Sequence, residues 1–299
     1  MARHVVVGAG PIGTATAAHL VELGHDVRMV TRRGTGPATV ERIATDATDA
    51  GRLAELAGGA AALYNCANPP YHRWPELWPP LATALLAAAE RSGAILVTMS
   101  NLYGYGAVAG PVTEDLPLRA TSVKGRIRAD MWRDALAAHQ AGRVRVTEAR
   151  GSDFIGPGAQ SLFTTQIAPS VRRGKATYVP AQLDAPHSST YTGDVGRTLA
   201  VLGTDERSLG RAWHVPTAPP TTLRALATQF AEVVGAPAPK LRAMPGAVLW
   251  LGGLFNTEAR EFREVRYQFD HPWVLDSSAA QQTFGLRPTS TAEALRSMI

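Results

Sequence analysis

The first part of the chain alternates between short apolar runs and polar turns. Val5-Val6-Val7 is a β-branched run that predicts a buried strand, and the Ala-rich stretch 11–23 predicts a helix that ends at Gly24. Asp26–Thr31 then predicts a second strand. A strand, a helix and a second strand in this order are typical of the βαβ unit of a parallel sheet.

The alternation continues to about residue 150. Further strands are predicted at 43–46, 61–68, 94–100 and 143–150, and helices at about 50–57, 81–91 and 121–140. The strand at 94–100 is continuously apolar, as expected of a parallel strand buried on both faces. The pattern therefore predicts an α/β fold with a doubly wound parallel sheet, the Rossmann arrangement.

After Gly151 the pattern becomes irregular. It predicts helices at 162–173, 194–202, 223–234 and 259–269 and short strands at 176–180 and 189–192, with Pro- and Gly-rich links. Asp194 is expected to cap the helix that returns to the first domain. We expect a dinucleotide-binding domain over 1–160, joined by 193–212, and a smaller irregular substrate-binding lobe over 161–192 and 213–299.

Three glycines after the first strand carry the clearest chemistry. In Gly8-Ala9-Gly10-Pro11-Ile12-Gly13, Gly8 permits a tight turn, Gly10 lets a pyrophosphate approach the backbone, and Gly13 lets the helix pack close to the strand. The helix then offers its free N–H groups to the phosphates. This context predicts a dinucleotide site that includes Pro11 and Ile12; the alternative is a glycine-rich turn in another α/β fold.

The end of the second strand bears on the choice of cofactor. A carboxylate there would bind the ribose 2′-hydroxyl of NAD, but the chain reads Thr31-Arg32-Arg33. Two guanidinium groups suit a 2′-phosphate, so we expect NADP(H). The alternative is that one or both arginines are only solvated. Asp46, after the third strand, either contacts the adenine side or caps the next helix.

Other candidates follow the fourth and fifth strands, where ligands bind in a doubly wound sheet. Cys66, Ala67 and Asn68 are expected beside the cofactor, with Cys66 as a small packing residue rather than a nucleophile. The fifth strand delivers four more polar side chains to the same edge: Ser100, Asn101, Tyr103 and Tyr105. Lys124 and Arg128 lie one turn apart on the helix that follows.

Composition narrows the classes of partner. The chain has 299 residues, 45% hydrophobic and 18% charged, with a net charge of +5 and no Lys/Arg run longer than two, which argues against a nucleic-acid footprint. Its one cysteine excludes an internal disulfide and a multi-Cys metal site, and the scattered histidines predict no metal. The sequence shows no signal peptide and no run of membrane-spanning length, so we expect a cytoplasmic protein.

Several motifs together resemble the extended short-chain dehydrogenase/reductases, which include nucleotide-sugar epimerases and dehydratases. The likeness covers nearly the whole chain and rests on the glycine motif, Asp46, and the stretches 65–67, 100–106, 113–117, 153–158, 191–195, 275–278 and 284–288. It implies the Rossmann fold and a nicotinamide cofactor, and it assigns Phe154 to the cofactor site.

One departure from this family is pronounced. The family places a catalytic Tyr and, four residues on, a Lys at the start of the long helix; here the matching positions hold Lys124 and Arg128. The chain is similar in this respect to the Tyr-lacking ketoreductases of aromatic polyketide antibiotic pathways, angucyclinone ketoreductases among them. That resemblance implies NADPH-dependent reduction of a polycyclic aromatic ketone, an activity of antibiotic biosynthesis.

We expect Ser100, Asn101 and Lys124 to be the catalytic groups. For Lys124 three roles stay open: it donates a proton as an acid, it binds the cofactor ribose, or it is a solvated surface residue. Alternatively, a phenol of the substrate next to the carbonyl supplies the hydrogen bond, and no donor from the protein is needed. The substrate residues are expected to be Tyr103, Tyr105, His187 and Tyr191. A further aromatic set forms a pocket roof or packs the core: Trp250, Phe255, Phe262 and Trp273.

Three functions compete at this point. The first is the NADPH-dependent ketoreductase. The second is a nucleotide-sugar epimerase or dehydratase, which the loss of the Tyr base argues against. The third is a cofactor-binding sensor that has lost catalysis. The sequence leaves the ketone and the oligomeric state open.

Overall fold

Seven parallel strands form the central sheet of the protein, seen here in a computed structural model that describes residues 1–245, 248–250 and 257–299. The strands are β1 (Arg3–Val7), β2 (Asp26–Thr31), β3 (Glu41–Ala44), β4 (Ala60–Asn65), β5 (Ile95–Asn101), β6 (Val146–Gly151) and β11 (Ala212–His214). Their order across the sheet is β11-β6-β5-β4-β1-β2-β3, and every pair is parallel. The order reverses between β1 and β4, which confirms the predicted doubly wound sheet.

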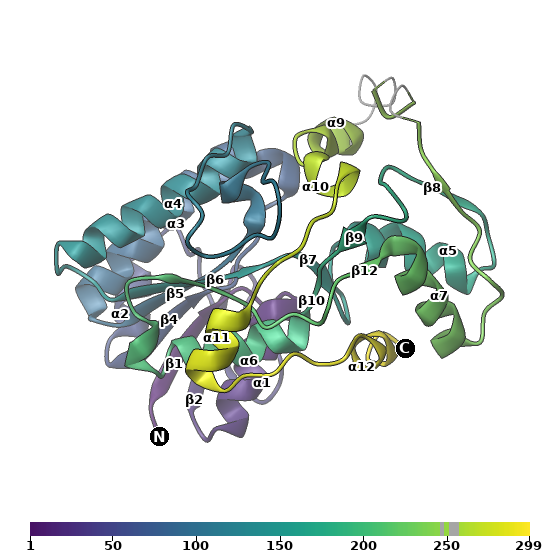
Figure 1. Ribbon diagram of the computed structural model, residues 1–299. Helices are drawn as coiled ribbons and strands as arrows, with labels where there is room; N and C mark the ends of the chain where they lie inside the picture. The colour runs from purple at the N-terminus through teal and green to yellow at the C-terminus, as the bar shows by residue number, and fades with distance from the viewer. Residues whose placement is uncertain (246–247, 251–256) are drawn as a thin grey trace.

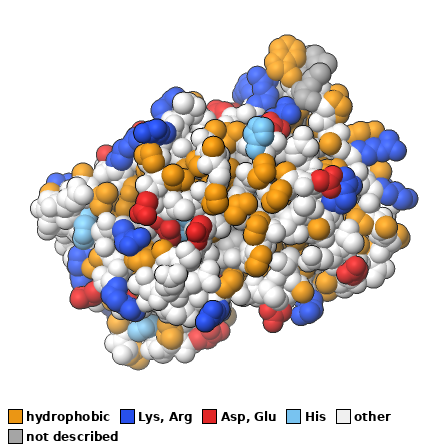
Figure 2. Space-filling view, in the orientation of Figure 1, with side chains coloured by type: hydrophobic (Ala, Val, Ile, Leu, Met, Phe, Trp, Pro, Cys, Tyr) orange, Lys and Arg blue, Asp and Glu red, His pale blue; other side chains and the backbone are white. Residues whose placement is uncertain are grey.

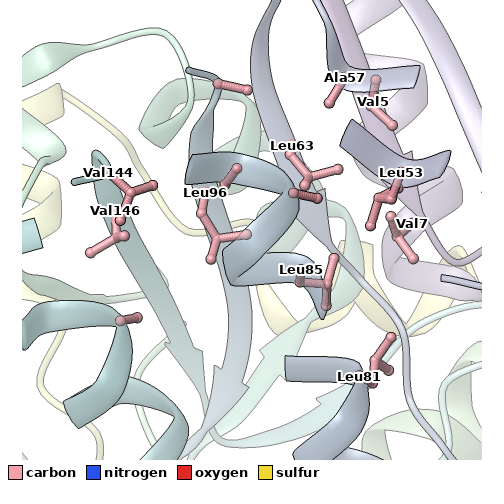
Figure 3. Close-up of a cluster of buried hydrophobic side chains, with 14 of the residues drawn as sticks. Val5, Val7, Leu53, Ala57, Leu63, Leu81, Leu85, Leu96, Val144 and Val146 are labelled. Carbon is pink, nitrogen blue, oxygen red and sulfur yellow. The ribbon is translucent and has the colours of Figure 1, made fainter. Parts of the chain in front are cut away.

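Helices cover both faces of this sheet (Figure 1). One layer holds α2 (Ala50–Ala57), α3 (Trp74–Ser92) and α4 (Val123–Gln140); the other holds α1 (Pro11–Glu22), α6 (Thr192–Leu202) and α11 (Ser278–Phe284). Side chains alternate between the two layers: Val5 and Val7 join the first core and Val6 joins the second. Figure 3 shows the first core, where strand residues such as Leu63 and Leu96 lie among helix residues such as Leu53 and Leu85.

The remaining described elements form a smaller, irregular lobe. It contains a π-helical turn at Phe163–Ile167, α5 (Ala168–Arg172), α7 (Leu223–Val234), α9 (Thr257–Arg263), α10 (Tyr267–Asp270) and α12 (Thr291–Arg296). Its strands pair in twos: β7 (Asp153–Ile155) with β10 (Ser189–Tyr191), β9 (Pro186–His187) with β12 (Thr221–Thr222), and β8 (Thr177–Val179) with β13 (Leu241–Ala243). A separate core joins this lobe, with Phe163, Phe230 and Leu295 among its members.

The expected helix 81–91 begins seven residues earlier, at Trp74, although Pro79 and Pro80 lie inside it. A proline inside a helix costs about 3 kcal/mol. Trp74 and Trp78 lie one turn apart on the buried face, and burying such a side chain contributes about 4–6 kcal/mol on an area basis. Packing of the two indoles therefore outweighs the prolines, which lie on the exposed side.

Two further expectations need correction. Asp194 does not cap α6, whose N-cap is Tyr191. The Asp194 carboxylate instead accepts hydrogen bonds from the Thr289 backbone N–H and hydroxyl.

The helix expected over 259–269 is divided into α9 and α10. Phe262, Val265 and Phe269 keep the spacing of one helical face across the break, so the apolar pattern alone could not reveal it.

Helix α6 packs against α1. The contact is close because Gly196 has no side chain: a Cβ there would lie 2.6 Å from the backbone carbon of Ala15. This approach holds the second helix layer against the glycine motif at the start of α1.

We therefore expect Gly196→Ala to lower the free energy of unfolding by about 1–2 kcal/mol, because the steric cost exceeds the gain in helix propensity. Urea denaturation measures it. Gly51→Ala in α2 is the matched control, since its Cβ meets only the Asp49 carboxylate, at 3.4 Å, and its stability should hold or rise. A Gly196→Ala protein as stable as the wild type would contradict this account of the packing.

Candidate functional site

The glycine motif builds an open cradle between β1 and α1. Gly8 has a φ of +104°, and a Cβ there would lie 2.7 Å from the Cys66 carbonyl oxygen. A Cβ on Gly13 would lie 1.9 Å from the Gly8 carbonyl oxygen. Gly10 differs, because a Cβ there would meet no atom within 4 Å. The space over Gly10 and the first amides of α1 fits a pyrophosphate, and Pro11 occupies the first turn of that helix.

The end of β2 lies at the same edge of the sheet. The Thr31 hydroxyl accepts a hydrogen bond from the Thr35 backbone N–H at 2.7 Å, which closes the turn that carries Arg32 and Arg33. Both arginines are exposed and appear in none of the ion pairs among the described residues.

Asp46 is not the cap of α2. That role belongs to Asp49, whose carboxylate accepts from the Arg52 N–H. The Asp46 carboxylate accepts from the Thr48 N–H and hydroxyl, each at 2.9 Å, and these bonds hold its pKa below the ordinary value, with Arg32 adding to the effect. Asp46 is therefore ionised and exposed to solvent near Arg32, and the adenine assignment stays a prediction.

The segment after β4 follows the cradle. Cys66 is buried, and burial raises the pKa of its thiol to about 12, so it packs as expected rather than acting as a nucleophile. Ala67 is half-buried and Asn68 exposed. Ile12 is half-buried against the second core, and so is Phe154, whose ring packs against Gly151 at the end of β6.

Lys124 lies on the first turn of α4 and is 1% exposed, so the solvated alternative is wrong. Its ammonium group contacts Glu261 on α9, lies 3.8 Å from the Glu264 carboxylate, and stands 4.6 Å from the centre of the Tyr71 ring. The Lys124 backbone N–H also donates to Glu264. A segment about 140 positions away thus supplies the counter-charges of this lysine (Figure 1).

Arg128, one turn further along α4, is committed to packing. Its guanidinium lies between the Trp74 and Trp78 rings, 4.6 and 4.3 Å from their centres, and burial lowers its pKa to about 10. It faces the first core, and it also lies close enough to Tyr71 and Tyr103 to interact with both phenols.

The end of β5 brings aromatic groups to Lys124. Ser100 is buried, and the Asn101 side-chain oxygen accepts from the Tyr103 N–H at 3.1 Å. The Tyr71 hydroxyl donates to the Tyr103 hydroxyl at 3.3 Å. Burial raises the pKa of Tyr103 to about 12 and that of Tyr71 still further, so both phenols stay neutral donors at ordinary pH. Tyr71, Glu261 and Glu264 are site residues that the sequence did not single out.

Tyr105 has a different place from the one expected. It is 2% exposed, its hydroxyl accepts from Arg150 at 2.7 Å, and it lies 2.8 Å from His214 Nε2. Arg150 in turn donates to the buried Glu148. This internal network removes Tyr105 from the surface of the site.

His187 and Tyr191 lie in the irregular lobe. His187 is buried, pairs with the Asp153 carboxylate at 2.7 Å and stacks on Phe269 at 5.1 Å. Asp153 lies close enough to Tyr71 and Tyr103 to contribute to their raised pKa values. The Tyr191 ring lies against Gly156 and Gly193. The His187–Asp153 pair therefore adjoins the site through its acid partner.

The proposed aromatic roof is not assembled as one surface. Trp273 is buried and packs edge-on against Tyr267, and Phe262 packs against Phe269. Trp250 is 54% exposed, and Phe255 lies outside the described residues. Among the residues the structure describes, no three His, Cys, Asp or Glu side chains are arranged to hold a metal ion, and no helix has the length and apolarity to cross a membrane.

The family and fold of this chain are established by comparison. The model of the NAD dependent epimerase/dehydratase family matches residues 4–208. UDP-glucose 4-epimerase from Thermotoga maritima, solved with UDP-glucose, has a TM-score of 0.79 at 17% identity, over 99% of this chain and 97% of that one. No curated protein matches the sequence.

Two dTDP-glucose 4,6-dehydratases, each solved with NAD, are also similar. The enzyme from Bacillus anthracis has a TM-score of 0.78 at 14% identity, and DesIV from Streptomyces venezuelae, a double mutant, has 0.77 at 20%. Each match covers 100% of this chain and 95% of the other. At these identities the structural likeness establishes the fold.

Gly10 offers a direct test of the cradle. We expect Gly10→Ala to leave the free energy of unfolding within about 0.5 kcal/mol, because the added methyl group meets no protein atom and the site is a surface position. The same methyl group should block the pyrophosphate, so dinucleotide affinity should fall at least tenfold in calorimetric titrations. A stable variant with unchanged affinity would place the cofactor elsewhere.

Proposed function

Because the chain belongs to the NAD dependent epimerase/dehydratase family, we propose that it transfers a hydride between a nicotinamide dinucleotide and a carbon–oxygen group of a small molecule. The observation that carries this proposal is the arrangement at one edge of the sheet. The cradle of Gly8, Gly10 and Gly13 follows the end of β1 there, and β5 ends there with Ser100 and Asn101. The turn after β5 carries Tyr103, whose hydroxyl is bonded to Tyr71 beside Lys124. Ligands of doubly wound sheets bind at this edge.

We propose that the favoured direction is reduction of a carbonyl. An ammonium group has protons to donate and stabilises the negative oxygen that forms as hydride arrives. Oxidation of an alcohol requires a base, and an ammonium group paired with Glu261 is a proton donor rather than a base. The nicotinamide would supply the hydride; the chain's own residues orient the carbonyl and meet its oxygen.

Nucleotide-sugar epimerisation or dehydration is the second candidate. It is favoured by the solved structures of the same fold, which include an epimerase with UDP-glucose and dehydratases with NAD. These relatives support a nucleotide-sugar substrate better than they support an aromatic polyketide. For the reductase we therefore specify the substrate only as a small molecule with a carbonyl group. Activity assays should include UDP- and dTDP-sugars as well as ketones.

For the cofactor we propose NADP(H). The exposed pair Arg32 and Arg33 supports it, because neither arginine has an ion-pair partner among the described residues. The two dehydratases named above contain NAD, so this preference rests on the present chain's own residues.

Replacing Arg32 and Arg33 together by Ser should reduce NADPH affinity about 10–100-fold, since a hydrogen bond to a charged group contributes about 1.5–3 kcal/mol. NADH affinity should change less than threefold. Calorimetric titration of both cofactors measures the difference, with exposed Arg91→Ser as the control. Equal losses for both cofactors, or no loss, would remove the case for a 2′-phosphate site.

The role of Lys124 is tested by Lys124→Met, which keeps the length of the side chain and removes its charge. If the ammonium meets the developing oxyanion, kcat for ketone reduction should fall about 10²–10³-fold, the usual effect of losing such a donor. Exposed Arg126→Met on the same helix should keep its rate.

Cofactor titration and thermal unfolding of the Lys124→Met protein separate a lost donor from a lost fold. An unchanged kcat in a folded variant would contradict the donor role and point to a proton supplied by the substrate itself. Conversion of UDP-glucose or dTDP-glucose by the wild type, with no ketone reduced, would favour the second candidate.

A further inference from the structure

A groove of about 650 Å³ lies beside the candidate site. The segment 107–111, after the loop that carries Tyr103, forms one side, and residues 267–274 form the other. Hydrophobic side chains gather on this face of the molecule, near α10 (Figure 2). Among the described residues, its lining contains no Lys, Arg, Asp or Glu.

Two hydrogen-bonding atoms in the lining have no partner among the described residues. They are the hydroxyl of Tyr267 and the indole nitrogen of Trp273, and both are shielded from solvent. Trp273 as a whole is 2% exposed. A buried polar atom without a partner is costly, and an indole N–H can only donate. Both atoms are therefore suited to an oxygen that enters the groove from outside the chain.

The groove is connected to the candidate site through aromatic packing. Tyr267 and Trp273 meet edge-on with ring centres 5.6 Å apart, and both pack with Tyr105 and Val108. Burial and the Tyr103 phenol raise the pKa of Tyr267. Tyr103 in turn bonds to Tyr71 beneath Lys124.

We propose that this groove binds the uncharged, apolar ring portion of the substrate, with an acceptor oxygen of that portion facing Tyr267 and Trp273. The inference rests on the proposed function, because it takes the reacting carbonyl to lie at Lys124. It identifies the substrate class as a molecule with an apolar body that extends away from the reacting group. A diphosphate is unsuited to the groove, since a buried anion requires a cation or several donors.

Binding of two simple probes tests the groove without turnover. The probes are α-tetralone, a neutral bicyclic ketone, and tetralin, the same ring system without the oxygen. The readout is the indole N–H signal of Trp273 in the NMR spectrum of the labelled protein, identified as the one missing from Trp273→Phe. We expect α-tetralone to shift this signal and to bind about 3–10-fold more tightly than tetralin, as one hydrogen bond allows.

Variants make the expectation specific. Tyr267→Phe and Trp273→Phe should each weaken α-tetralone binding about 3–10-fold. Trp250→Phe is the matched control, because this indole is on the exposed surface, and its affinity should be unchanged. Tyr267→Phe keeps the ring and therefore the packing, so it remains informative if Trp273→Phe is unstable.

Three results would overturn the proposal: an unshifted Trp273 signal with α-tetralone, which would mean that the groove holds only water; equal binding of tetralin; or a Trp273 shift caused by UDP-glucose. Failure of the proposed reaction is distinguishable. If α-tetralone binds but no ketone oxidises NADPH, the groove is supported and the proposed reductase activity is contradicted. If ketones are reduced at the same rate by Tyr267→Phe and Trp273→Phe, the reductase activity is supported and the groove is contradicted.

Discussion

The arrangement of the site depends on one buried ammonium group. Lys124 is almost wholly enclosed at the start of α4, and a charge in such a place is tolerated only with a counter-charge. Glu261 and Glu264 provide it from α9 and the residue following it. These ion pairs connect the irregular lobe to the edge of the central sheet. Tyr71 and Tyr103 lie at the same connection, and the groove beside Tyr267 adjoins them.

The fold was predictable because its determinants are local. The glycine spacing, the β-branched run before it and the alternation of apolar segments specify a doubly wound sheet without long-range information. The weaker points were those at which packing decided the outcome. Trp74 and Trp78 extend α3 through two prolines, and the break between α9 and α10 leaves the apolar spacing intact.

The site was only partly predictable, for the same reason. The positions of Ser100, Tyr103 and Lys124 near the end of β5 and the start of α4 could be predicted from where strands and helices begin and end, while their roles stay predictions. Glu261 and Glu264 could not, because nothing in a sequence links a lysine to carboxylates about 140 positions away. Tyr71 had a usable signal: it follows the fourth strand after two prolines, on the edge where ligands bind. Tyr105 was predicted to contact the substrate because it follows the fifth strand at the ligand-binding edge of the sheet. Its side chain is instead buried and bonded to Arg150, which the sequence did not reveal.

The chemistry of Lys124 and that of the groove lead to the same kind of substrate. If the carbonyl reacts at Lys124, as proposed, the ammonium group there offers protons and favours reduction over a base-initiated oxidation. A lining without Lys, Arg, Asp or Glu among the described residues, but with two unsatisfied donors, favours a neutral body with an acceptor oxygen. Nucleotide sugars combine a polar sugar with a diphosphate, and the groove as described has neither a cation for the diphosphate nor the many polar side chains that a sugar requires. The family indicates the cofactor and the fold, while in the function proposed here the residues around Lys124 and Tyr267 determine which substrate the cofactor can reduce.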